Sequence, residues 1–139
     1  MDQGLDSTHR MGTPEVIERI KAIAGRSGDG PVMMLNINRY TDAAAFPEGA
    51  AYSRYMTHLG AAVGQVGGAV LWRTSVSAQV IGCEHENYDE LLAVWYPSRT
   101  AFLELAAAAD APAMFDGRKL CVEHATILEL PADSAPFAR

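Results

Sequence analysis

The chain has 139 residues, of which 49% are hydrophobic, with a formal net charge of −6 and a pI of about 5.1. This length is typical of one domain with a single core. The acidic charge argues against a nucleic-acid partner, because such proteins present a basic face. No apolar run approaches the roughly 18–20 residues that cross a bilayer. Two cysteines make no disulfide scaffold, so we expect a reducing, cytoplasmic location.

The composition divides the chain into three parts. Residues 1–30 form an N-terminal extension, which the Gly-rich stretch GRSGDGP at 25–31 separates from the rest. Residues 31–130 form the main domain, and residues 131–139 form a tail. We therefore expect one folded domain with a short element before it.

The N-terminal extension contains one predicted helix over residues 14–24. Thr13 is suited to the N-cap and Pro14 to the first helical position. A helix of about three turns is marginal alone, so we expect it to dock on the domain or on a second subunit. The apolar residues at helical spacing are Val16, Ile20 and Ile23.

The hydrophobic period of the main domain changes in the order two, 3.6, two, two, 3.6, two. This order predicts an α+β fold of the β-α-β-β-α-β type, the ferredoxin-like arrangement. The predicted strands span residues 32–40, 69–81, 88–96 and 122–130, with a polar turn at 83–87.

Two helices complete the predicted unit. The first begins near Pro47 and ends at Gly67-Gly68; the second is capped by Ser98 and is interrupted or restarted around Pro112 and Gly117. The inward residues of the first are Tyr52, Tyr55, Met56, Leu59, Val63 and Val66, and those of the second are Ala101, Phe102, Leu105 and Ala109.

Two helices cover only one face of a four-stranded sheet. The strands are apolar on both faces, as Trp72, Leu92 and Val94 illustrate. A bare apolar face of that size exceeds what monomers usually expose. We therefore expect a second copy to pack sheet to sheet across a two-fold axis, which makes a homodimeric α/β barrel.

Several segments resemble a family of small, uncharacterised bacterial proteins in the dimeric α/β-barrel superfamily. The likeness spans about residues 31–130, and its most specific part is VGG, then LW, then YPSR followed by AFLE. It implies a ferredoxin-like homodimer but no catalytic residues. The superfamily includes cofactor-free monooxygenases, polyketide cyclases, haem-degrading enzymes, lactone isomerases and ligand-binding regulators. Where relatives have a histidine after the second helix, this chain has Gly117, Arg118 and Lys119.

Polar residues on the predicted strands and first helix are candidates for a ligand site. Asn36 and Asn38 share one strand face, where they form either the polar floor of a pocket or hydrogen bonds to a neighbouring loop or the dimer mate. Tyr52 and Tyr55 lie above them as pocket or core residues. The pocket is expected between the helix-covered sheet face and the first helix, near the exit of the first strand.

Arg73 and His124 are the charged candidates. Arg73 points away from its neighbour Trp72, and it meets either an anionic ligand or a glutamate such as Glu123 or Glu129. His124, on the last strand, is the candidate catalytic proton-transfer group or else a structural histidine.

Four zinc-type ligands also occur, as Cys83-x-His85 and Cys121-x-x-His124. In a sheet of order 4-1-3-2 the two pairs lie about 14 Å apart, at three strand spacings of roughly 4.8 Å. We therefore expect no metal site. No glycine-rich phosphate loop follows the first strand, and we expect no cofactor.

Three functions fit these features. The first is a cofactor-free enzyme of the monooxygenase, cyclase or isomerase type, acting on an aromatic or polyketide-like metabolite. The second is a non-catalytic metabolite binder, and the third a structural or accessory homodimer with a filled interior. The volume of the interior pocket distinguishes the third from the other two.

Overall fold

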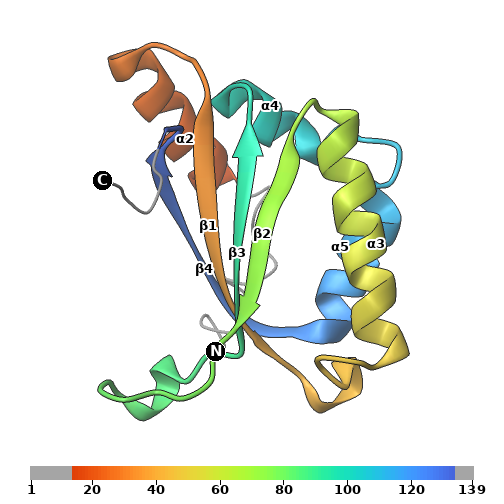
Figure 1. Cartoon of the computed structure of the whole chain (residues 1–139). Helices are drawn as coiled ribbons and strands as arrows, with labels where there is room; N and C mark the ends of the chain where they lie inside the picture. The colour runs from red at the N-terminus through yellow and green to blue at the C-terminus, as the bar shows by residue number, and fades with distance from the viewer. Residues whose placement is uncertain (1–13, 134–139) are drawn as a thin grey trace.

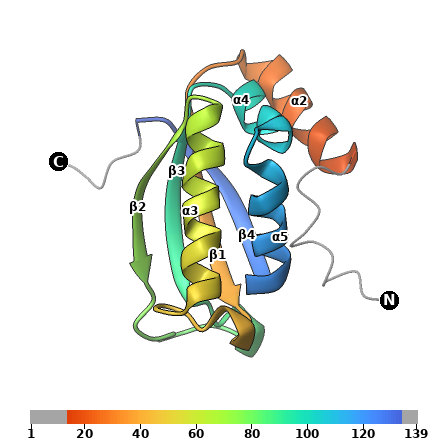
Figure 2. The same cartoon turned by 90° about the vertical axis from the view of Figure 1, so that its right-hand side faces the viewer.

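The computed structural model of this chain describes residues 14–133 and shows an α+β fold. A four-stranded antiparallel sheet has the order β2-β3-β1-β4, and the four helices of the described residues lie on one side of it (Figures 1 and 2). The helices are α2 (Pro14–Ser27), α3 (Ala50–Gln65), α4 (Arg99–Glu104) and α5 (Ala111–Cys121). The strands are β1 (Val32–Tyr40), β2 (Ala69–Ser75), β3 (Glu90–Tyr96) and β4 (Val122–Pro131).

The alternation along β1 fixes the two faces of the sheet. Met34, Asn36 and Asn38 point toward the helices, and Asn36 is paired in register with Leu92 of β3 and Ile127 of β4. The odd-numbered residues of β1 therefore point to the other face, which no described helix covers (Figure 1). The apolar residues whose register places them on this bare face are Met33, Leu35, Ile37, Trp72, Leu91, Trp95, Leu128 and Leu130.

The core lies between the sheet and α3 with α5, which run side by side in Figure 2. Tyr52, Tyr55 and Val63 of the predicted α3 stripe are buried, and Met56, Leu59 and Val66 pack at its margin. The side chain of Tyr55 contacts the backbone of α5 so closely that a Cβ at position 117 would lie 3.1 Å from the Tyr55 Cβ. Gly117 therefore lies inside α5 and allows α3 and α5 to approach each other closely. It does not interrupt α5, contrary to the prediction.

The boundaries of α3, β2 and β3 differ from the predictions, and β4 extends to Pro131, one residue beyond its predicted end. Helix α3 begins at Ala50 rather than near Pro47, because residues 45–49 form a turn closed by a Gly49 N–H bond to the Ala45 carbonyl (2.6 Å). Strand β2 ends at Ser75 rather than 81, since the residues after Val76 have no neighbouring strand to pair with. Strand β3 begins at Glu90 instead of 88.

The second predicted helix is two helices. Ser98 caps α4 as expected, with its hydroxyl accepting from the Ala101 N–H (3.0 Å). The chain leaves the helix at Leu105–Ala107, and Ala109, predicted to face inward, is exposed. Pro112 then lies in the first turn of α5, where its missing N–H costs nothing.

Helix α2 continues to Ser27, beyond the predicted end at residue 24, and packs against α4 of its own chain. Ile20 is buried, and Val16 and Ile23 are half-buried. The predicted cap Thr13 lies outside the described residues. Within residues 14–133, no helix combines the length and apolar character that a membrane span requires.

Candidate functional site

A pocket of about 290 Å³ lies between α2 and the helix-covered face of β1 and β4. This volume is near the lower end of the range for small-molecule sites, about 300–1,000 Å³. Its walls are largely apolar, and its ionisable lining residues are Arg19, Arg118 and Glu129. The complete lining is Val16, Arg19, Ile20, Ile23, Met34, Phe102, Arg118, Ala125, Ile127 and Glu129.

Arg118 provides the cationic group of this pocket from within the core. It lies on the inward stripe of α5, is only 5% exposed, and donates from Nη1 to the Tyr55 hydroxyl (3.2 Å). A guanidinium presents several donors in a planar fork, which suits carboxylate, sulfonate or phosphate oxygens. The pocket therefore combines an apolar wall with a buried group that can bind an anion.

Arg99 holds the rim of the pocket together. Its guanidinium forms a two-pronged pair with Glu129 (2.8 and 2.7 Å) and donates to the Gly28 carbonyl after α2 (2.9 Å). The Asp29 carboxylate accepts from the Arg99 N–H (2.7 Å) and from the Thr100 hydroxyl. These bonds join the α2–β1 connection, the start of α4 and β4, and so position α2 over the sheet.

Two carboxyl groups of this rim have perturbed acidities. The hydrogen bonds and charge of Arg99 hold the pKa of Glu129 below its usual value. The hydroxyl of Thr100, together with backbone N–H groups, lowers the pKa of Asp29 in the same direction. Both carboxylates therefore stay ionised in the folded protein to lower pH than in the unfolded chain.

The predicted asparagine floor is present, but the space above it is nearly filled. A cavity lined by Asn36 and Tyr55, with Arg118 at its edge, has a volume of about 10 Å³, which is room for about one water molecule. The Asn36 amide donates to the Met34 carbonyl on its own strand (3.3 Å). Asn36 and Tyr55 thus line the same cavity, as predicted, but this cavity is too small for a metabolite.

The other three predicted ligand residues meet around a buried carboxylate. Tyr40 and Tyr52 donate to the two oxygens of Glu90 (2.6 Å each), and Arg73 donates to the Tyr52 hydroxyl (2.8 Å). Because the Tyr40 proton is directed at Glu90, the amide of Asn38 is the donor in its 3.1 Å contact with the Tyr40 oxygen. The hydrogen bonds of this cluster thus form one directional chain, although the buried Oδ1 of Asn38 has no hydrogen-bond partner among the described residues.

The two tyrosines of the cluster remain protonated donors. Burial and the hydrogen bond to Glu90 raise the pKa of Tyr40 and of Tyr52 well above the usual value. Neither hydroxyl is thereby suited to act as a base near neutral pH. The arrangement is that of a structural hydrogen-bond network in the core.

His124 is separated from the other predicted site residues by the sheet itself. It is paired in register with Arg39, so its side chain lies on the bare face, opposite to Asn36 and Asn38. Its ring stacks on Tyr88, with centroids 5.8 Å apart. His124 therefore cannot join the asparagines in one pocket of the same subunit.

An open hollow of about 290 Å³ also lies at the end where β1 exits, the predicted position of the pocket. It is walled by residues other than the predicted set: Tyr40, Thr41, Asp42, Ala45, Phe46 and Asp89. The stacking of Phe46 on Tyr40 (5.0 Å) closes this hollow from the core. It is consequently a surface feature.

Sequence reasoning missed the two arginines that build the α2 pocket. Arg118 follows Met114 by four residues and precedes Cys121 by three, so helical spacing alone places it on the buried stripe. A charged residue in a buried stripe indicates a candidate site residue, because a buried cation requires a polar or charged partner. Arg99 lies in the YPSR motif, but it bonds to Gly28, Asp29 and Glu129. These residues are far from Arg99 in the sequence, so no local sequence pattern could have predicted the contacts.

Comparisons with known proteins give structural relatives only. RPA0582, a protein of unknown function from Rhodopseudomonas palustris, has 29% sequence identity and a TM-score of 0.68, covering 85% of this chain and 92% of its own. The methylated form of RPA0582 aligns with 28% identity and a TM-score of 0.70, covering 90% and 95%. No family model and no curated protein matches the chain. The likeness supports the fold and names no activity.

Replacing Tyr52 by phenylalanine is expected to destabilise the fold by about 1–3 kcal/mol, because Glu90 and Arg73 each lose a buried partner. The matched control is Tyr96→Phe, a buried tyrosine whose hydroxyl forms no hydrogen bond within residues 14–133, and it should change stability by under about 0.5 kcal/mol. Urea unfolding at one fixed protein concentration measures both. Equal losses in the two variants would contradict the network.

The Arg99–Glu129 pair predicts a defined pH dependence. Because folding lowers the pKa of Glu129, its contribution is present above the unfolded-state pKa of about 4.3 and is lost as the pH falls through the folded value. Glu129→Gln should therefore reduce stability at neutral pH, by under about 1 kcal/mol for a partly exposed pair. The difference from the unsubstituted protein should shrink as the pH falls below the unfolded-state pKa. A difference independent of pH in urea unfolding would exclude this role.

Proposed function

We propose that this chain is a homodimeric binding protein for a small, largely apolar anion, and that its topology is the ferredoxin-like one of dimeric α/β barrels. The observation that carries the ligand proposal is the 290 Å³ pocket with Arg118 in its wall. The topology is supported by the element order after α2 and by the sheet order β2-β3-β1-β4, which reads 4-1-3-2 from the other edge. The split of the second helix into α4 and α5 leaves this order unchanged.

The dimer is supported by the bare face of the sheet. Trp72 is 43% exposed and Leu128 is 46% exposed, and both lie on this face with the odd-numbered apolar residues of β1. Polar residues, among them Arg39, His124 and Thr126, gather toward one end. An apolar centre with a polar margin is the usual composition of an interface between subunits.

The loop between β2 and β3 supports the same interface. It projects from the end of the sheet on the side away from the helices (Figure 1). Val80 and Ile81 in this loop are 88% and 92% exposed, which is costly for branched apolar side chains in a monomer. A second copy packed on the bare face would lie beside this loop and can cover both residues.

Leu128→Glu is expected to convert the dimer to monomers, because it buries a charge in the sheet-to-sheet contact. Leu120→Glu is the matched control, since Leu120 is equally exposed (48%) but lies on α5. Sedimentation velocity at micromolar concentration measures both variants and the unsubstituted protein. The proposed interface would be wrong if the unsubstituted protein were monomeric, or if the Leu128→Glu variant remained a dimer.

The ligand class follows from the charges in the α2 pocket. Glu129 is the only carboxylate in the lining, and Arg99 already pairs with it. Arg19 and Arg118 place two guanidinium groups in the same lining. The apolar walls, including Phe102, suit an aromatic or aliphatic body. Together they fit a hydrophobic molecule with one carboxylate or similar group.

The cofactor-free enzyme acting on an aromatic metabolite stays a prediction and ranks second. The same pocket can hold such a substrate, with Arg118 stabilising an oxyanion. Its lining residues, however, include two arginines and an ion-paired glutamate as ionisable groups, none of them a ready general base near neutral pH. The geometry therefore favours binding over turnover.

Two dyes of similar shape test the ligand class: 8-anilinonaphthalene-1-sulfonate and its neutral analogue N-phenyl-1-naphthylamine. The sulfonate is expected to bind about tenfold more tightly, because a hydrogen bond to a charged group is worth about 1.5–3 kcal/mol. Arg118→Met should remove this preference and leave affinity for the neutral dye unchanged. Isothermal titration calorimetry gives the four dissociation constants.

The position of the dye is tested on α2. Ile23→Trp fills the pocket and should weaken binding of the sulfonate dye by at least about tenfold, whereas Ala22→Trp, on the exposed side of the same helix, should not. Equal binding to all variants would place the dye elsewhere, on the bare sheet face for example, and would overturn the pocket proposal.

A further inference from the structure

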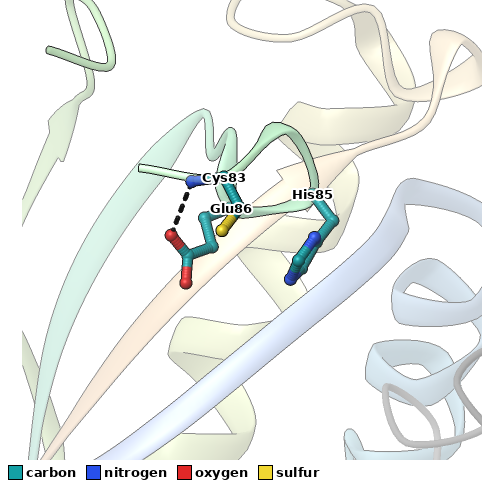
Figure 3. Close-up of side chains that lie close together, drawn as sticks. All are labelled: Cys83, His85 and Glu86. Atoms are coloured by element: carbon teal, nitrogen blue, oxygen red, sulfur yellow. Dashed lines mark hydrogen bonds between the residues drawn. The ribbon is translucent and has the colours of Figure 1, made fainter. Parts of the chain in front are cut away.

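The turn between β2 and β3 brings together three side chains that commonly bind metals. Cys83, His85 and Glu86 stand at the short 3₁₀ turn Glu84–Glu86, and their ligand atoms all lie within 4.8 Å of one another. Figure 3 shows the three side chains pointing to the same side of the turn. All three residues are exposed, so an ion can reach them from solvent. The cluster is remote from the pocket under α2.

The backbone of this turn is held in place by hydrogen bonds from outside and within it. Gln79 Nε2 donates to the Cys83 carbonyl (2.8 Å), which also accepts from the Glu86 N–H (2.9 Å). Arg39 of β1 donates to the carbonyls of His85 (3.2 Å) and Asn87 (3.3 Å). The three candidate ligands therefore lie on a turn that is already formed. Metal binding does not have to offset the entropy cost of ordering a flexible loop.

The set differs from the four-ligand site considered from the sequence. Cys121 is fully buried at the junction of α5 and β4, and burial raises the pKa of its thiol, which favours the protonated form. His124 is engaged with Tyr88. Only Cys83 and His85 remain from that set, and the third ligand is Glu86, one residue further along the turn.

We propose that Cys83, His85 and Glu86 form a binding site for a divalent transition-metal ion of the zinc type. Thiolate and imidazole select zinc over magnesium or calcium. Bonds of about 2.0–2.3 Å in a tetrahedron place ligand atoms roughly 3.3–3.8 Å apart. The present spacing needs to contract by about an ångström, which rotation of exposed side chains allows. The Glu86 carboxylate uses Oε1 to accept from the Cys83 N–H (2.9 Å), so Oε2 is the oxygen directed to the metal.

Three protein ligands leave a fourth position for water, the arrangement that catalytic rather than structural zinc sites use. Binding replaces the thiol proton of Cys83 by the metal, and this proton goes to solvent.

Cobalt(II) is the spectroscopic probe of this site, because a thiolate bound to Co²⁺ gives a charge-transfer absorption and a four-coordinate ion gives strong visible bands. The full chain, without a histidine tag, is expected to show both bands at one ion per chain, and Zn²⁺ should displace them. Cys83→Ser should abolish the charge-transfer band, and Cys121→Ala should retain it.

Matched variants test the other two ligands. His85→Ala and Glu86→Gln should each weaken Co²⁺ and Zn²⁺ binding by at least about tenfold, as loss of one of three ligands implies. His58→Ala on α3 and Glu84→Gln in the same turn should change it by under about twofold. The proposal is overturned if no charge-transfer band appears, if the band survives Cys83→Ser, or if Glu84→Gln weakens binding as much as Glu86→Gln.

Discussion

The strict alternation of β1 between the helix-covered face and the bare face of the sheet is the constraint from which the rest of this structure follows. One set of its side chains meets the helices and includes Asn36 and Asn38; the other is apolar and meets no described helix. A shift by one residue would exchange the two sets and place the asparagines on the bare face. The register with β3 and β4 therefore decides at once where polar groups can form a network and where a second subunit can pack.

On the helix-covered face, polar groups and open space occupy different places. The Glu90 network joins the buried Tyr40 and Tyr52 to the exposed Arg73 on the edge strand β2. The larger pocket opens instead where α2 spans the sheet, and its shape depends on Arg99, which ties the end of α2 to β4. Helix α2, which precedes the first strand of the sheet, thus forms a wall of the ligand site proposed here.

The central strand β1 could be predicted because side chains of alternate residues point to opposite faces of the sheet, and it matches its predicted span. The end of β2 could not, because branched residues such as Val80 favour a strand only where a neighbour is available to pair. The face of His124 depends on the register between β4 and β1, which one sequence does not specify. Arg118 was within reach of prediction from its helical spacing, whereas its position beside α2 depends on tertiary packing.

The β2–β3 loop carries both the apolar pair Val80 and Ile81 and the metal-ligand turn, so the two proposed interactions share one segment. Linkage makes their relation reciprocal: if metal binding strengthens self-association, self-association must strengthen metal binding by the same factor. Such coupling requires the loop to differ between monomer and dimer. The bonds from Arg39 and Gln79 hold the turn within a single chain, which favours a metal affinity that is independent of assembly. By contrast, Val80 and Ile81 become buried only when a second copy is present. We therefore expect these two residues to contribute to the proposed dimer. We expect the metal ion to bind to the turn, which is already formed in each subunit.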